Sequence, residues 1–284
     1  MGYLHIPNLY KDQTVMLFKR VYCLEKIHGT SAHITIDPQE SVISYFTGDN
    51  YEHFKSLFNE KEILSRMGNK PRLTVYGEHY GGKIQGQSHR YGTNKKFVAF
   101  DVQIGGHWLD VERAEKIVLD LGLEFVHYTE CAAMLESVDY WRDYHSVQSW
   151  RNGGITLQTR EGIVIRPPIE MIMNNGERVI AKHKRPEFSE TKTHREVNEH
   201  PEKQASFDIA EEWVTQNRLL NILSHHHYDK IEDTPKIVIA MIEDVLREGD
   251  FEVQDTRENR KAIGSAAAKL FRQHLIDKAR RQME

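Results

Sequence analysis

The chain has 284 residues, a formal net charge of −4 at pH 7, and 39% hydrophobic and 28% charged residues. This composition is ordinary for a globular protein, and the length allows one large domain and a smaller one. No apolar run approaches the ~20 residues that cross a bilayer, and residues 1–13 lack the pattern of a secretory signal. Two cysteines, Cys23 and Cys131, are too few for a disulfide framework and fit a reducing cytoplasm.

The first two-thirds of the chain alternate between β-rich runs and helical patterns. Runs rich in valine, isoleucine and aromatic residues predict strands at 21–25, 73–80, 97–104, 162–167 and 178–184. Apolar residues at helical spacing, followed by a glycine, predict helices at 50–68 and 110–122.

From about residue 203 the β-rich runs disappear. Helical patterns cover 206–226, 234–249 and 256–281, and Thr234 is expected to cap the second of them. The last pattern places one apolar face along the helix, formed by Ile263, Ala267, Leu270, Phe271 and Leu275.

The polar segment 189–204 reads as a linker. We therefore expect a β-rich domain at 1–195 and a small all-α domain at 203–284. The second domain lacks the β-rich segments that a barrel of the OB type requires.

The strongest chemical signal is the segment Glu25-Lys26-Ile27-His28-Gly29-Thr30. A lysine becomes a good nucleophile only where burial or nearby positive charge lowers its pKa. If the preceding strand continues through Ile27, Lys26 and His28 point to the same side, and Gly29 lets a ligand approach the backbone. Taken alone, the segment is better explained as a surface lysine beside a turn.

Further segments follow Lys26 in a particular order, namely YGE (76–78), AFD (99–101), EGIVIRP (161–167) and AKHK (181–184). Together with Lys26 they resemble the ordered motifs of the covalent nucleotidyltransferases, the superfamily of ATP-dependent ligases and mRNA capping enzymes. Histidine two residues after the lysine, and FSE (188–190), resemble the nick-sealing RNA ligase 2 family of bacteriophage type. The resemblance spans about residues 22–192. It implies an α+β fold, with a nucleotidyltransferase domain of antiparallel sheets and flanking helices (ATP-grasp-like, as in ligase adenylation domains) plus a small all-α C-terminal domain.

The resemblance also implies roles for single residues. Lys26 would attack the α-phosphorus of ATP, and further catalytic residues in contact with phosphates would be His28, Arg166, Lys182 and Lys184. Glu161 would hold Mg²⁺ or Mn²⁺, since such ions take one or two carboxylates beside phosphate and water. The nucleotide itself would be bound by Lys26, Lys182, Lys184 and Glu161 together with Glu25, Gly29, Glu78 (ribose), Phe100 (adenine) and Asp101.

One position departs from the family pattern. The family has a basic residue before a Thr-Gly pair, whereas this chain has Phe46 in SYFTGDN (44–50). The contact with phosphates or with the nick is then made elsewhere, or the sealing step differs. Lys83 and Arg90, in the loop at 81–92, are candidates to supply the missing charge.

Residues 257–281 carry a net charge of +6 with histidine neutral. Through Arg257, Arg260 and Lys261 this helix would hold the RNA backbone. The solvated outer face of a packing helix explains the same charges equally well.

The resemblance implies an ATP-dependent RNA ligase that joins RNA 3′-hydroxyl and 5′-phosphate ends in RNA repair, through a lysyl-AMP intermediate and an adenylated 5′ end. ATP and Mg²⁺ or Mn²⁺ would be its cofactors and RNA its partner, without a membrane. We expect a cytoplasmic monomer from a bacterium or a phage-infected cell, for which an end-processing kinase or phosphatase could prepare the ends. The alternatives are an ATP-dependent DNA or polynucleotide ligase, a capping-type nucleotidyltransferase, and a non-catalytic RNA-binding protein.

Overall fold

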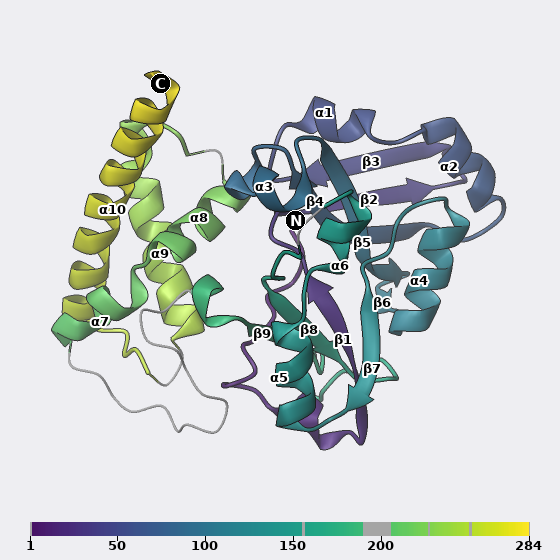
Figure 1. The fold of residues 1–284 in the computed structure, drawn as a ribbon, viewed down its shortest axis with the longest axis horizontal. Helices are drawn as coiled ribbons and strands as arrows, with labels where there is room; N and C mark the ends of the chain where they lie inside the picture. The colour runs from purple at the N-terminus through teal and green to yellow at the C-terminus, as the bar shows by residue number, and fades with distance from the viewer. Residues whose placement is uncertain (1, 155–156, 190–205, 227, 250–251, 284) are drawn as a thin grey trace. The chain divides into compact units, whose positions relative to one another are not determined.

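The computed structural model describes residues 2–154, 157–189, 206–226, 228–249 and 252–283 (Figure 1). The chain divides into two compact units, Met1–Arg185 and Pro186–Glu284. The linker expected at 189–204 lies, apart from Ser189, outside the described residues. Among the residues that are described, no helix combines the length and the apolar character needed to span a membrane.

Within the described part of the larger unit, the strands form two antiparallel sheets (Figure 1). The first has the strand order β7-β1-β8-β9, with bounds Tyr128–Ala132, Arg20–Lys26, Gly162–Arg166 and Ala181–Lys184. The second has the order β3-β2-β4-β5-β6, with bounds Val42–Thr47, Thr30–Asp37, Leu73–Gly81, Lys95–Ile104 and His107–Trp108. The predicted α+β unit of antiparallel sheets is confirmed. The last predicted strand is shorter than expected, since β9 begins at Ala181 and not at residue 178.

The core of this unit lies on one face of the second sheet. Along β2, Ala32, Ile34 and Ile36 are buried and alternate with half-exposed residues, as expected for a sheet with one covered face. The covering helices are α1 (Tyr51–Ser56), α2 (Glu60–Met67) and α4 (Val111–Asp120). The other face carries Ser31, His33, Tyr76 and Glu78 and is half-exposed.

The helix predicted at 50–68 is wrong as a single helix. The Asn59 side chain accepts a hydrogen bond from the Glu62 amide and starts α2 as a new helix, because an N-cap side chain satisfies a free amide of the first turn. The helix predicted at 110–122 is confirmed as α4, which is capped by Asp110. The remaining helices of this unit are short, namely α3 (Ser88–Tyr91), α5 (Leu135–Asp143) and α6 (Val147–Arg151).

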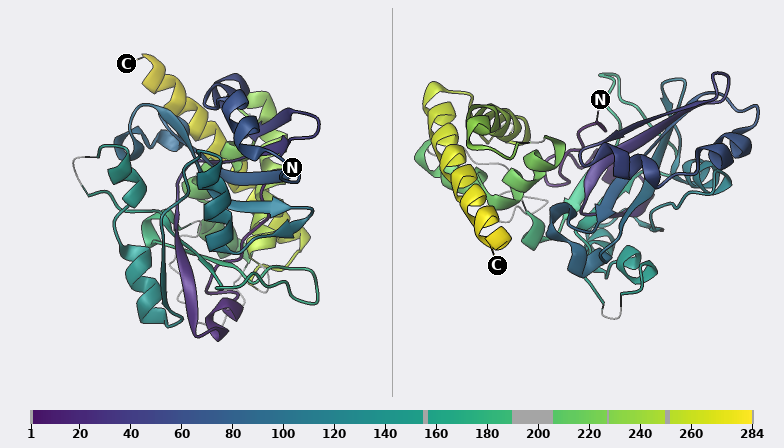
Figure 2. Two further views of the ribbon diagram at one scale, coloured as in Figure 1. Left: turned by 90° about the vertical axis from the view of Figure 1, so that its right-hand side faces the viewer. Right: turned by 90° about the horizontal axis from the view of Figure 1, so that it is seen from above.

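The described residues of the smaller unit form helices α7 (Ser206–Trp213), α8 (Gln216–His225), α9 (Thr234–Glu248) and α10 (Arg257–Met283), the last a single long helix (Figure 2). The small all-α unit is therefore confirmed. The pattern at 206–226 splits into two helices because Thr215 caps α8 by accepting from the Arg218 amide. On the predicted face of α10, Ile263, Ala267 and Phe271 are fully buried.

The expected cap of α9 is wrong. Thr234 lies inside this helix, and its hydroxyl donates to the carbonyl of Ile231. Asp233 takes the N-cap position, without a side-chain hydrogen bond to the helix. Pro235 stands in the first turn, where proline is favoured.

Candidate active site

Lys26 is the last residue of β1, and its side chain meets a buried carboxylate. Its ammonium lies 3.0 Å from Oε2 of Glu161, which is 2% exposed and immediately precedes β8. Nδ1 of His28 lies 3.2 Å from the same oxygen, and the ammonium of Lys184 lies 3.2 Å from Oε1. The fold thus brings Lys26, His28 and Lys184 together around one carboxylate.

Strand register explains why the two lysines meet. Lys26 stands opposite Gly162 across β1 and β8, and Gly162 stands opposite Lys184 across β8 and β9. Side chains directly opposite each other share one face of a sheet. Since Gly162 contributes no side chain, the space between the lysines stays clear. Lys182 lies two residues before Lys184 on the same face of β9.

The charge state of Glu161 follows from two opposing effects. Burial by itself would raise the pKa of this carboxyl, but the neighbouring Lys26, Lys184 and His28 hold the pKa well below its ordinary value of 4.5. Glu161 is therefore an anion at neutral pH that faces three cationic or potentially cationic groups. Because an ammonium has no lone pair, Lys26 must lose a proton and leave this ion pair before it can act as a nucleophile.

Glu78 borders the same cluster from β4. Its Oε1 accepts a hydrogen bond from the Gly29 amide at 3.1 Å. A side chain at Gly29 would meet the carbonyl oxygen of His79 at 2.5 Å, so the close approach to β4 is what requires glycine. Burial raises the pKa of Glu78 to about 8, and the attraction of Lys26 only partly opposes this. Contacts of Glu78 and Gly29 with nucleotide remain predictions.

The raised pKa of Glu78 predicts a pH-dependent cost to folding. Because the folded-state pKa lies above the ordinary 4.5, Glu78 lowers the free energy of unfolding progressively as the pH rises from about 4.5 to about 8. We expect Glu78→Gln to be more stable than the parent at pH 9 by about 1 kcal/mol or more, with little difference at pH 4.5. Thermal denaturation across this pH range would test it, and a pH-independent difference would contradict it.

Glu25 lies on the opposite side of β1 from Lys26. Its carboxylate accepts hydrogen bonds from the Ser146 hydroxyl at 2.5 Å and from the Val147 amide at 2.9 Å. These bonds anchor the start of α6, and burial raises the pKa of Glu25. The prediction that Glu25 binds nucleotide gains no support from these contacts.

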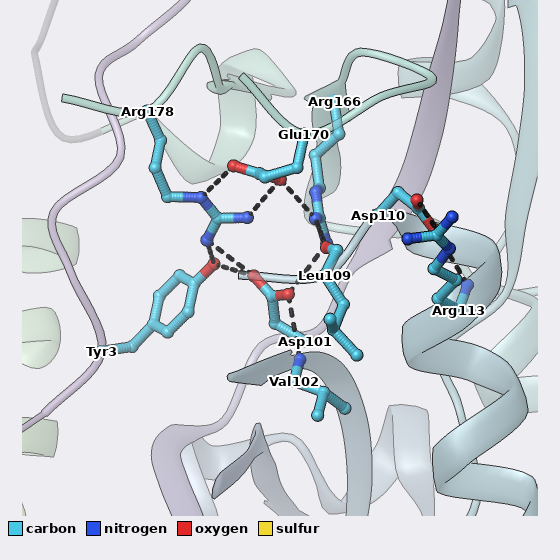
Figure 3. Close-up of polar contacts among 9 residues, drawn as sticks. All are labelled: Tyr3, Asp101, Val102, Leu109, Asp110, Arg113, Arg166, Glu170 and Arg178. Carbon is cyan, nitrogen blue, oxygen red and sulfur yellow. Dashed lines mark hydrogen bonds and ion pairs between the residues drawn. The ribbon is translucent and has the colours of Figure 1, made fainter. Parts of the chain in front are cut away.

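A second polar cluster holds Asp101 and Arg166 (Figure 3). Asp101 is fully buried and accepts from Arg166 at 3.1 Å and from Arg178 at 2.7 Å. Glu170 bridges the two guanidinium groups, and the Tyr3 hydroxyl donates to Asp101 at 2.6 Å. Two arginines and two carboxylates thus balance one another in the interior.

The predicted phosphate contact of Arg166 is not supported by this arrangement. Arg166 is 2% exposed, also donates to the carbonyl of Leu109, and lies four residues along β8 from Gly162, about 13 Å away. Asp101 orients Arg166 and Arg178, and the prediction that it binds nucleotide gains no support from these contacts. The roles of Tyr3, Glu170 and Arg178 were not predicted from the sequence. No short motif joins these three residues. A weak signal was Arg178, a charged residue in a predicted strand.

Phe100 occupies a β-bulge in β5. Tyr76 pairs with Asp101 and Gly77 pairs with Ala99, so Phe100 is the extra residue between them. Its ring is half-buried and meets the ring of Tyr3 edge-on, with centroids 4.9 Å apart. Stacking of Phe100 on adenine stays a prediction.

The candidates for replacing the family's missing basic residue differ in their surroundings. Lys83 is exposed, whereas Arg90 donates to Gln87 and to the carbonyl of Thr159. In the smaller unit, the predicted RNA-binding residues are all exposed on α10, and Arg260 forms an ion pair with Asp255; these residues are Arg257, Arg260 and Lys261.

The donor chemistry suits a divalent ion that is bound mostly by phosphate and water. In the described ranges there is no group of three or more histidine, cysteine, aspartate or glutamate side chains that could hold a metal by itself. Mg²⁺ and Mn²⁺ at nucleotide sites need only one or two carboxylates. Glu161 is ionised, and its two oxygens face the ammonium groups of Lys26 and Lys184. A single ionised carboxylate in a site for cations meets that requirement.

The antiparallel two-sheet unit, with a lysine held at a buried carboxylate, has the form of a covalent nucleotidyltransferase. A sequence model of the RNA ligase family matches residues 19–184, which is more than half of the chain. The chain therefore belongs to the RNA ligase family. No curated protein sequence gives a significant match.

Solved structures similar to this chain include variants of the RNA ligase of Naegleria gruberi. One, with AMP and Mn, is 13% identical with a TM-score of 0.50, covering 65% of this chain and 56% of that one. Another, with ATP and Mn, is 14% identical with a TM-score of 0.50, covering 66% and 57%. The likeness is one of fold, and this chain matches little more than half the length of those ligases.

Proposed function

We propose that this protein is an ATP-dependent RNA ligase that seals RNA 3′-hydroxyl and 5′-phosphate ends through a lysyl-AMP intermediate. The observation that carries the proposal is the meeting of Lys26, His28 and Lys184 around the buried Glu161, inside the part of the chain that matches the RNA ligase family. The Naegleria gruberi ligases of similar fold, which were solved with AMP or ATP and Mn, support the same cofactors here.

In the first step, the neutral amine of Lys26 attacks the α-phosphorus of ATP. A nitrogen–phosphorus bond forms, the nitrogen releases a proton to solvent, the bond to the bridging oxygen breaks, and pyrophosphate leaves with the electron pair. Lys182 and Lys184, on one face of β9, neutralise charge that develops on the phosphate oxygens. Glu161 holds Lys26 in place before reaction and releases it when ATP arrives.

Glu161 is also the residue that would hold Mg²⁺ or Mn²⁺. Such an ion would supply charge neutralisation for an in-line displacement. Glu78 accepts hydrogen bonds from the ribose hydroxyls, and Phe100 stacks on the adenine. His28 contacts a phosphate of the nucleotide.

Two further transfers complete the reaction. The 5′-phosphate of one RNA end attacks the lysyl-linked phosphorus, Lys26 leaves, and an adenylated 5′ end with a pyrophosphate linkage results. The 3′-hydroxyl of the other end then attacks the RNA phosphorus and AMP leaves. The exposed basic residues of α10, Arg257, Arg260 and Lys261, contribute phosphate contacts to RNA binding. The biological setting that we propose is RNA repair in the cytoplasm of a bacterium or a phage-infected cell, by a monomer that uses ends prepared by a kinase or phosphatase.

The decisive experiment is sealing of nicked duplexes whose 3′-hydroxyl strand is either RNA or DNA, with ATP and Mg²⁺ or Mn²⁺, followed on a denaturing gel. We expect ligation at an RNA 3′ end to be at least about tenfold faster than at a DNA 3′ end, because a ligase for RNA must contact the 2′-hydroxyl. Equal sealing of DNA ends would favour a polynucleotide ligase. Covalent labelling by GTP instead of ATP would favour a capping-type enzyme, and the absence of any lysyl-AMP would contradict the proposal.

A further inference from the structure

A row of aromatic rings crosses the half-exposed face of the second sheet. Phe46 on β3 stands directly opposite His33 on β2, and His33 stands opposite Tyr76 on β4. The rings of Phe46 and His33 are stacked, with centroids 4.9 Å apart and planes inclined by 12°. His33 and Tyr76 follow at 5.1 Å. The residue that replaces the family's basic side chain is thus the outermost ring of an ordered row.

This part of the face offers aromatic rings for stacking, and its strands carry no basic side chain. Its residues on β3, β2 and β4, as placed by register and alternation, include no lysine or arginine; they are Ser44, Phe46, His33, Thr35, Thr74 and Tyr76. Burial lowers the pKa of His33 to about 4, so its imidazole is neutral at pH 7. A phosphate would find no cation on these strands, whereas the flat face of a nucleobase would find an aromatic ring.

A further flat ring can stack on the side of Phe46 that faces away from His33. β3 is the edge of its sheet, and within the described part of the chain His33 is the ring that Phe46 contacts. The row is also continuous with the candidate active site. Ser31 and Glu78 form the next pair on the same face, two residues along β2 and β4 from His33 and Tyr76, or about 7 Å.

We propose that Phe46, supported from behind by His33, stacks on a nucleobase of the RNA substrate near the ends being joined. This inference rests on the proposed RNA ligase function and names a contact that the family pattern does not supply. A base contact takes the place of the phosphate contact that the family's basic residue would make. Since every base has an aromatic face, the contact favours RNA with bases near the break without selecting a sequence.

The effect of removing the ring follows from the strength of aromatic–base stacking. Such stacking contributes ~1–3 kcal/mol per base, so Phe46→Ala should weaken binding of nicked RNA by about 5- to 150-fold. Phe46→Trp should bind as well as the parent, and Phe46→Leu, which is apolar but not aromatic, should resemble Phe46→Ala. Formation of lysyl-AMP from ATP without RNA should stay within about twofold for all three variants, because stacking on RNA plays no part in that step.

The position of the stacked base can be found with a set of nicked RNA duplexes, each with one abasic nucleotide near the nick. We expect one position at which the abasic RNA weakens binding to the parent protein but does not weaken binding to Phe46→Ala any further. Tyr140→Ala, which removes a ring that is 59% exposed on α5, is the matched control and should bind like the parent at every position.

The outcomes separate the two proposals. Additive effects of Phe46→Ala and the abasic site at every position, or full binding by Phe46→Leu, would overturn the stacking proposal. So would an equal loss of lysyl-AMP formation in Phe46→Ala, since this would indicate a damaged nucleotide site. A parent protein that forms no lysyl-AMP and binds no RNA would instead remove the proposed ligase function itself.

Discussion

Lys26→Ala is expected to form no covalent adduct with AMP, a loss of about 10⁴-fold or more in the rate of adenylation. The reason is that Lys26 is the lysine that both ends β1 and lies 3.0 Å from the buried Glu161. Lys184 meets the same carboxylate from β9, but it belongs to the last motif and not to the motif that carries the proposed nucleophile. The measurement is incubation with ATP labelled at the α-phosphate and a divalent ion, followed by denaturing electrophoresis.

Lys61→Ala provides the control for this experiment. Lys61 is exposed on α2, on the helical side of the second sheet, and its removal should leave labelling unchanged. Lys26→Ala should still seal RNA that has been adenylated beforehand, at a reduced rate, because the final step does not use lysine as a nucleophile. An adduct that persists in Lys26→Ala would place the covalent chemistry at another residue and refute the assignment.

The second large effect is expected at Glu161. Glu161→Gln keeps the size of the side chain and removes its charge, which leaves Lys26, Lys184 and His28 facing one another without an anion. Breaking a buried ion pair in this way should lower the free energy of unfolding at pH 7 by about 3 kcal/mol. Adenylation should fall by about 100-fold or more, since in the proposed mechanism Glu161 both aligns Lys26 and holds the divalent ion.

The lowered pKa of Glu161 determines how the stability difference between the parent and Glu161→Gln changes with pH. The folded-state pKa of Glu161 lies well below the ordinary 4.5, so its stabilisation is fully present above pH 4.5 and is lost as the pH falls through the lowered value. Denaturant unfolding of the parent and of Glu161→Gln should therefore differ most at neutral pH and converge in acid. Glu136→Gln, at an exposed position of α5, is the control. A difference that grows in acid would show that Glu161 is not held as an anion.

Local sequence patterns predicted which helices and strands are present better than where each of them begins and ends. Strand alternation and helical spacing are properties of neighbouring residues, so β4, β5, β8 and α4 could be read from the sequence. The breaks before Asn59 and Thr215 were missed, since apolar spacing continued across them. A capping side chain is visible in the sequence but competes there with the surrounding periodicity.

Part of the candidate site could also be predicted from local sequence patterns. The order of the motifs predicted Lys26, Glu161 and Lys184 as site residues, because they lie within short, recognisable segments, and the structure places these three side chains together. The RNA ligase family match over residues 19–184 agrees with that identification of the family. What each residue contacts could not be read from its motif.

Strand register decides which side chains contact each other across the sheets, and register is a long-range property. Glu161 and Arg166 belong to one motif and stand five residues apart, yet only Glu161 meets Lys26, because β1 and β8 pair with Lys26 opposite Gly162. Arg166 instead lies at the far end of β8, where β5 and the N-terminal segment bring Asp101 and Tyr3 to it. Phe46 appeared in the sequence as a missing charge, and only the pairing of β3, β2 and β4 showed it to be the end of an aromatic row. Short-range patterns thus identified the chemical groups, whereas the packing of distant strands selected their partners, because that packing involves residues tens of positions apart.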